Sequence, residues 1–110
     1  MKRFAYSDRA VRMEFFEEEP VVITAFISDD MDKRIMESGK LIAQADKGGA
    51  VDGRTEKYEA ALALLIGEDK TAALLTRAPQ RDSFAVMELW NHIVGCYREQ
   101  KTKNLGAPVR

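Results

Sequence analysis

Three side chains near the C-terminus have the types and the spacing for chemistry, because Glu88, His92 and Cys96 recur every four residues. On a helix this spacing places them on one face, and a thiolate beside an imidazolium is the arrangement of cysteine nucleophiles. His92 and Cys96 are the only histidine and the only cysteine of the chain, and no glycine-rich turn adjoins them. Zinc needs three or four ligands, which one helix face rarely supplies. We therefore expect a packed or half-exposed pair rather than a catalytic or metal site.

Two other patterns resemble ligand sites only superficially. The acidic segment Asp29–Asp32 lacks the alternating ligands, the central glycine and the closing glutamate of a calcium loop, so it predicts the start of a helix. Gly48-Gly49 is not followed by Lys-Ser or Lys-Thr, and no G-x-G-x-x-G motif follows a strand, so nucleotide binding is not indicated. The sequence thus predicts no catalytic residue, no metal ligand set and no cofactor, and we expect a protein that is not an enzyme.

The amino-acid composition argues against nucleic acid and membranes as partners. The 110 residues suffice for one domain, and 17 Lys and Arg stand against 18 Asp and Glu, which gives no overall attraction to nucleic acid or to an anionic membrane. The only local basic bias lies in the segment Arg98–Arg110. The longest apolar stretches, Val21–Ile27 and Ala60–Ile66, are too short to span a bilayer, and the N-terminus lacks the pattern of a signal peptide. We expect a cytoplasmic protein that binds neither nucleic acid nor membrane.

The first third of the chain predicts β structure. Val11–Phe15 alternates apolar and polar residues, and Val21–Ile27 is almost continuously apolar and rich in β-branched residues, so each predicts a strand. Between them, Phe16–Pro20 contains three adjacent glutamates, which repel one another, and a proline, which lacks an N–H. This segment predicts the turn of a hairpin, and Arg3–Tyr6 would add a short third strand.

Helical periodicity begins after Ser28, which offers a cap oxygen together with the two aspartates that follow it. Gly39 falls inside this first helix, where it either permits close packing or breaks the helix. The three glycines of Lys47–Gly53 predict a flexible joint. A second helix, capped by Asp52 or Thr55, then runs to the glycine at position 67.

A short third helix begins at Glu68 and ends before the next proline. Asp82 and Ser83 cap the last and longest helix, from about Phe84 to Lys101, and a frayed tail follows it. Together these elements predict an α+β fold, with an N-terminal β-hairpin of two or three short strands followed by a mostly helical bundle of about four helices. We expect a single domain over residues 1–104 and a flexible C-terminal tail over residues 105–110.

The last helix has an unusually wide apolar face, with Phe84 and Leu89 flanking it. Such a face is most simply the core of a small domain. Methionine and tryptophan also suit adaptable contacts and binding hot spots, so part of the face could stay open for a partner or for self-association. The residues that we predict to bind a protein are Met87, Trp90, Ile93, Val94 and Tyr97.

Read in order, these elements resemble one family, the small tail assembly chaperones of long-tailed (siphovirus-type) phages and prophages. The segment Phe4–Glu14 is similar to the first strand of that family, and Leu64–Asp69 followed by Ala72–Leu75 is similar to its step from helix through Gly-Glu-Asp to a short helix. The closing helix resembles the final amphipathic helix. The chain departs from the family in its Glu-rich turn, where members often have a short Gly-containing one, and in Gly39.

The resemblance implies a non-catalytic protein of the bacterial host cell that is absent from the finished virion. It would coat the tape measure protein, keep it soluble and help to recruit the tail tube protein. Members of the family tend to self-associate and often have a longer form made by translational frameshifting. The alternative is an unrelated small protein-interaction or regulatory module, such as an adaptor or an antitoxin-like protein, and a nucleic-acid binder is a lesser one.

Overall fold

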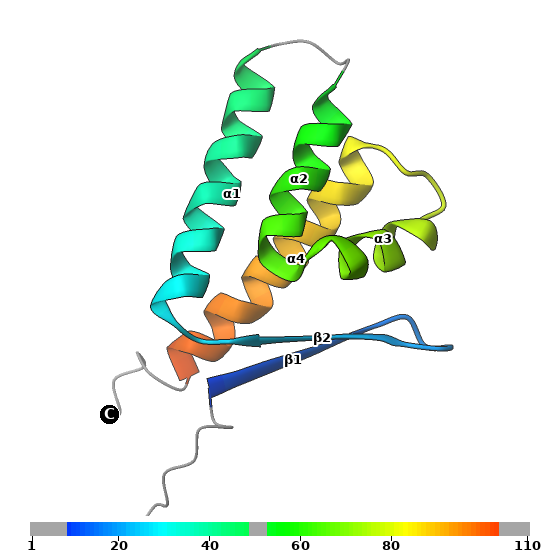
Figure 1. Cartoon of the computed structure of the whole chain (residues 1–110). Coiled ribbons are helices and arrows are strands. Elements are labelled where there is room, and N and C mark those ends of the chain that lie inside the picture. Colours follow the sequence, from blue (N-terminus) through cyan, green and yellow to red (C-terminus); the bar gives the residue numbers. More distant parts are fainter. Residues whose placement is uncertain (1–8, 49–52, 104–110) are drawn as a thin grey trace, which may run out of the picture.

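The computed structural model describes residues 9–48 and 53–103, which form a β-hairpin covered by helices (Figure 1). This arrangement confirms the predicted α+β class. The predicted strand Arg3–Tyr6, the alternative cap Asp52 and the tail 105–110 lie outside the described residues. The elements are β1 (Ala10–Phe15), β2 (Val21–Phe26), α1 (Asp29–Lys47), α2 (Arg54–Ile66), α3 (Glu68–Thr76) and α4 (Ser83–Lys101).

The predicted hairpin is present and antiparallel, with Ala10 opposite Phe26 and Phe15 opposite Val21. Alternate side chains of β1 point toward the helices and are buried, as period-two alternation requires. The helices cover only this face (Figure 1). The opposite face is exposed, and an ion pair of 3.5 Å joins Arg12 to Glu14 on it.

Arg77 fastens the hairpin turn to the end of α3. Its guanidinium donates hydrogen bonds to the carbonyl oxygens of Glu18 and Glu19, at 2.7 and 2.5 Å. The guanidinium carbon also lies 4.1 Å from the centroid of the Phe16 ring. Phe16 and Glu19 have positive φ angles of 72° and 49°, a region that residues other than glycine rarely adopt. The contacts of Arg77 therefore offset backbone strain in the turn.

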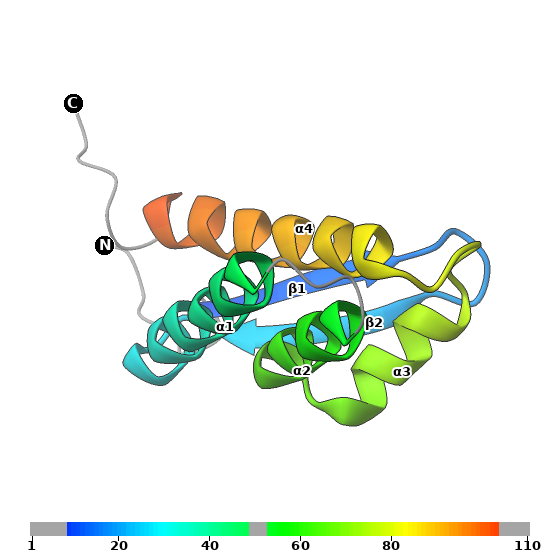
Figure 2. The same ribbon diagram turned by 90° about the horizontal axis from the view of Figure 1, so that it is seen from above.

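The helices make one layer over the hairpin. α1 and α2 stand side by side and run antiparallel, while α4 packs against β1 and α3 packs against β2 (Figures 1 and 2). Side chains from α2, α3 and α4 meet at the centre, where each is at most 1% exposed. These central side chains are Leu62, Leu74, Leu75, Val86, Ile93 and Tyr97. No helix in the described ranges is long and apolar enough to cross a membrane.

Two helix caps confirm the sequence prediction and one corrects it. Ser28 Oγ accepts a hydrogen bond from the Met31 N–H at 3.0 Å, and Asp82 Oδ1 accepts one from the Ala85 N–H at 3.0 Å. The predicted cap Thr55 is wrong, because Thr55 lies within the first turn of α2. Gly53 holds the cap position instead, with a φ of 80° and no side-chain hydrogen bond. Glycine adopts a left-handed φ without steric cost, so Gly53 can begin the helix although no side chain caps it.

The structure also decides between the two readings of Gly39. α1 continues through it without a break. A Cβ built at Gly39 would lie 4.0 Å from the Cζ2 atom of Trp90, which is ordinary van der Waals contact. Gly39 thus lies beside the indole of Trp90, and it does not break α1.

We expect Arg77→Ala to lower the free energy of unfolding by about 1–2 kcal/mol, because it removes two charged hydrogen bonds and a cation–π contact. Urea unfolding followed by circular dichroism measures this change. Lys70→Ala, at an exposed site of α3, is the matched control and should change stability by less than about 0.5 kcal/mol. Equal effects of the two substitutions would show that the turn does not depend on Arg77.

Candidate protein-binding groove between α1 and α4

The five residues predicted to bind a protein fall into two groups. Ile93, Val94 and Tyr97 are at most 3% exposed and belong to the core. Met87 and Trp90 are partly buried and pack against that core from its edge. Of the five, only Met87 and Trp90 therefore have more than slight exposure at the surface.

Trp90 lies in a groove between α1 and α4. The groove has a volume of about 410 Å³, which is room for a few side chains of a docked segment rather than for a folded domain. Its lining combines apolar side chains with one carboxylate and two cations. The lining residues are Asp32, Ile35, Met36, Gly39, Trp90, Tyr97, Arg98 and Lys101.

A short hydrogen-bond chain fixes Trp90 to α1. The indole Nε1–H donates to Ser38 Oγ at 2.8 Å, and the Ser38 hydroxyl donates to the carbonyl oxygen of Ile35 at 2.8 Å. Ser38 is fully buried, so both bonds satisfy a polar group that water cannot reach. The N–H of Trp90 is therefore bonded to α1, and the ring still lines the groove.

A second polar link joins the helices nearer the start of α1. The Tyr97 hydroxyl donates to Asp32 Oδ1 at 3.0 Å, and Lys101 Nζ donates to Asp32 Oδ2 at 2.8 Å. The hydrogen bond from Lys101 is the main reason that the pKa of Asp32 is lowered. Burial is the main reason that the pKa of Tyr97 is raised, and its hydrogen bond to Asp32 adds to this. The two links, at Trp90 and at Asp32, hold α1 and α4 at a fixed separation.

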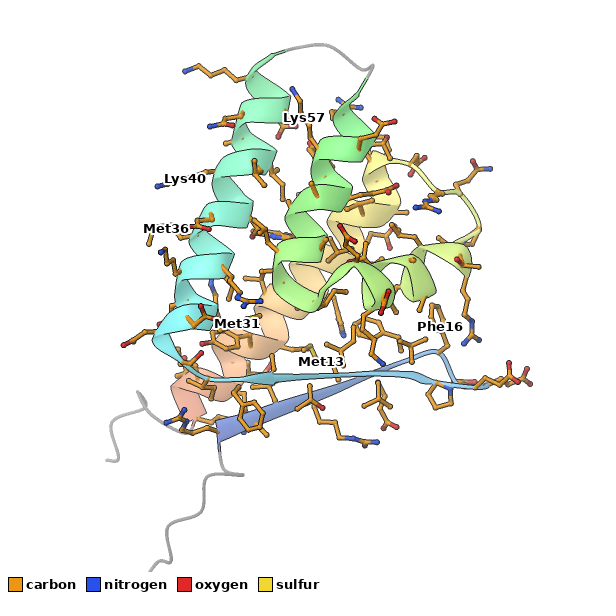
Figure 3. All side chains as sticks on the ribbon, in the orientation of Figure 1. Met13, Phe16, Met31, Met36, Lys40 and Lys57 are labelled. Carbon is orange, nitrogen blue, oxygen red and sulfur yellow. The ribbon has the colours of Figure 1, made fainter. Side chains whose placement is uncertain are left out.

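The exposed apolar side chains of α1 and α4 differ in where they lie. Met36 lines it and is 60% exposed, and Figure 3 shows that Met36 and Lys40 project from the same side of α1. Phe84, in the first turn of α4, is 73% exposed but does not line the groove, because it lies six positions before Trp90 and helical spacing turns it to a different side of α4. The sequence prediction did not include Met36. The sign of Met36 in the sequence is that this apolar residue follows Ile35 directly and so falls outside the buried apolar stripe of α1.

The sequence pattern Glu88–His92–Cys96 is placed elsewhere on α4. Cys96 Sγ lies 3.6 Å from His92 Nε2, as the spacing predicts, and the His92 ring meets the edge of the Phe15 ring at a centroid distance of 5.3 Å. Within the described part of the chain, Glu88 makes no hydrogen bond to His92, and no three His, Cys, Asp or Glu side chains could hold a metal ion together. The pair is a half-exposed neighbour of the hairpin.

Comparisons with known proteins give no match: no family model, no curated protein and no solved structure is similar to this chain.

We expect Trp90→Phe to lower the free energy of unfolding by about 1–2 kcal/mol, because the buried Ser38 hydroxyl loses a donor. A double-mutant cycle with Ser38→Ala, followed by urea unfolding, measures the interaction. In the Ser38→Ala protein the tryptophan substitution should cost less. Strictly additive effects would mean that the hydrogen bond does not stabilise the fold.

We expect Asp32→Asn to lower the melting temperature at about pH 7 and to matter less at about pH 2.5. A carboxylate whose native pKa is lowered stabilises the fold fully above its unfolded-state pKa, and this contribution is lost as the pH falls through the native pKa. The relevant window therefore lies below the ordinary value of 3.8. Thermal unfolding of both proteins at the two pH values measures the difference. A difference that does not shrink at low pH would contradict the ionised link.

Proposed function

We propose that this chain is a non-catalytic tail assembly chaperone of a long-tailed phage or prophage, and that it holds an amphipathic helix of the tape measure protein in the groove between α1 and α4. The observation that supports this most is the exposed Met36 beside Trp90 in that groove. Large apolar side chains at a rim of this kind are typical of protein-binding sites.

The groove suits a helix because its walls are helices. An amphipathic helix lays its apolar side chains into such a groove at positions i, i+3, i+4 and i+7. Trp90 supplies a rigid flat surface, and Met36 supplies a flexible side chain that adapts to different neighbours. A chaperone that binds many turns of a long helical client needs this tolerance more than it needs an exclusive fit.

The two polar links between α1 and α4 support binding without rearrangement. Trp90 is held by Ser38, and Asp32 is held by Tyr97 and Lys101. Because the walls are already fixed, a client helix loses its own freedom on binding but does not have to order the groove. On this proposal the chain works in the host cytoplasm, associates with further copies of itself along the tape measure protein and helps to recruit tail tube subunits.

An unrelated adaptor or antitoxin-like module would use the same groove for a different partner. The gene neighbourhood separates the two proposals. A tape measure gene directly downstream supports the chaperone, and a toxin gene or an unrelated operon contradicts it.

We expect Met36→Gln to reduce by several-fold the amount of tape measure fragment that stays soluble on co-expression. Glutamine nearly matches methionine in size and keeps helix propensity, so the change removes apolar surface alone. The fraction of the fragment in the cleared lysate, and its co-purification with this chain, measure the effect. The melting temperature should stay within a few degrees of the unsubstituted protein.

Phe26→Gln is the matched control, because Phe26 is 54% exposed but lies on the outer face of the hairpin. It should leave the soluble fraction unchanged. Equal losses with both variants would show that general surface hydrophobicity, and not the groove, keeps the fragment soluble.

A further inference from the structure

The charged groups around the groove are unevenly paired. Its one carboxylate, Asp32, is neutralised by Lys101 at 2.8 Å and also accepts from Tyr97. Arg98 lines the groove, and Lys40 lies one turn after Met36 on the exposed side of α1. Among the described residues, no carboxylate lies within ion-pair distance of Arg98 or of Lys40. Two cations, Arg98 in the lining on α4 and Lys40 just outside it on α1, are therefore without an ion pair among the described residues.

The other acids of α1 do not pair with these two cations: Asp29 instead acts on Lys101, whose pKa it helps to raise. Asp30 and Glu37 line a separate depression on the other side of α1, toward Ala63 and Leu64 of α2. On α4, Glu99 pairs with Lys103 at 3.2 Å. The groove therefore combines an apolar floor with a positive rim.

We propose that the occupant of this groove is an acidic amphipathic helix of a partner protein, with a row of apolar side chains flanked on both sides by glutamate or aspartate. Its apolar row would lie on Trp90 and Met36, and its carboxylates would meet Arg98 on one flank and Lys40 on the other. This inference rests on the proposed function and specifies the chemistry of the client segment.

Charge also favours a partner over the terminal segments of this chain. Residues 1–8 carry Lys2 and Arg3 against Asp8, and residues 104–110 carry Arg110 and no acid. Neither segment therefore has the carboxylate side chains on two flanks that the rim would pair with. A segment with carboxylates on both flanks is attracted, and Arg98 can hold a carboxylate through two parallel hydrogen bonds.

Two synthetic peptides test the proposal directly. Both are helical and share one apolar row, but one has glutamate and the other has lysine at the flanking positions. Trp90 is the only tryptophan of the chain, so with tryptophan-free peptides its fluorescence reports occupation of the groove. The glutamate peptide should bind at least about tenfold more tightly at low salt, and the difference should shrink as salt screens the rim.

Charge-reversal variants locate the effect. Arg98→Glu combined with Lys40→Glu should reverse the preference between the peptides. Lys57→Glu combined with Lys70→Glu makes the same change in net charge on exposed sites of α2 and α3, and it should keep the preference for the glutamate peptide. Lys40 and Lys57 lie on different helices in Figure 3, with Lys40 on the outer side of α1.

The outcomes separate this inference from the proposed function. Equal binding of both peptides, reduced alike by Met36→Gln, would overturn the acidic partner and keep a groove that binds helices. The acidic partner would also be overturned if Lys57→Glu with Lys70→Glu removed the preference as fully as Arg98→Glu with Lys40→Glu. Net charge alone would then explain binding. Binding of neither peptide would overturn the groove as a helix site, and with it the proposed function.

Discussion

The hydrogen bond from the Trp90 indole to the buried Ser38 hydroxyl joins α4 directly to α1, two helices that otherwise pack mainly on α2. Ser38 can be buried only because its hydroxyl both accepts from Trp90 and donates to a carbonyl oxygen of its own helix. Gly39, the next residue, lies beside the indole, where an added Cβ would make ordinary van der Waals contact. This contact and the link from Asp32 to α4 join the two helices across the groove, and Asp32, Trp90, Tyr97 and Lys101 from these links also line it.

The local elements could be predicted from the sequence because their causes are local. Alternation over Val11–Phe15 and the proline turn define the hairpin, and Ser28 and Asp82 cap their helices with their own side-chain oxygens. The start of α2 could not be predicted in the same way. It depends on the left-handed φ of Gly53, and a glycine in a run of glycines gives no sign of which one adopts it.

The site was predictable only in part. Helical spacing identifies the apolar face of α4, but it does not say which half of that face the rest of the chain covers. Ile93 and Val94 are buried in the core, whereas Trp90 is only partly buried and bonds to Ser38 of α1, and this difference depends on where the other helices pack. Met36 could not be recognised as part of the same surface without the structure, because its relation to Trp90 joins residues more than fifty positions apart.

The outward face of the hairpin affects how readily the chain aggregates while it folds. Among the described residues the helices cover one side of a two-stranded sheet, so Val22 and Phe26 lie on the other side, next to strand edges that no described strand pairs with. Such a surface can recruit strands from other unfolded chains. The Arg12–Glu14 pair lies at its centre, and bringing a second apolar strand over it would strip water from two charges. The pair therefore acts as a gatekeeper that discourages aggregation while the helices are still assembling.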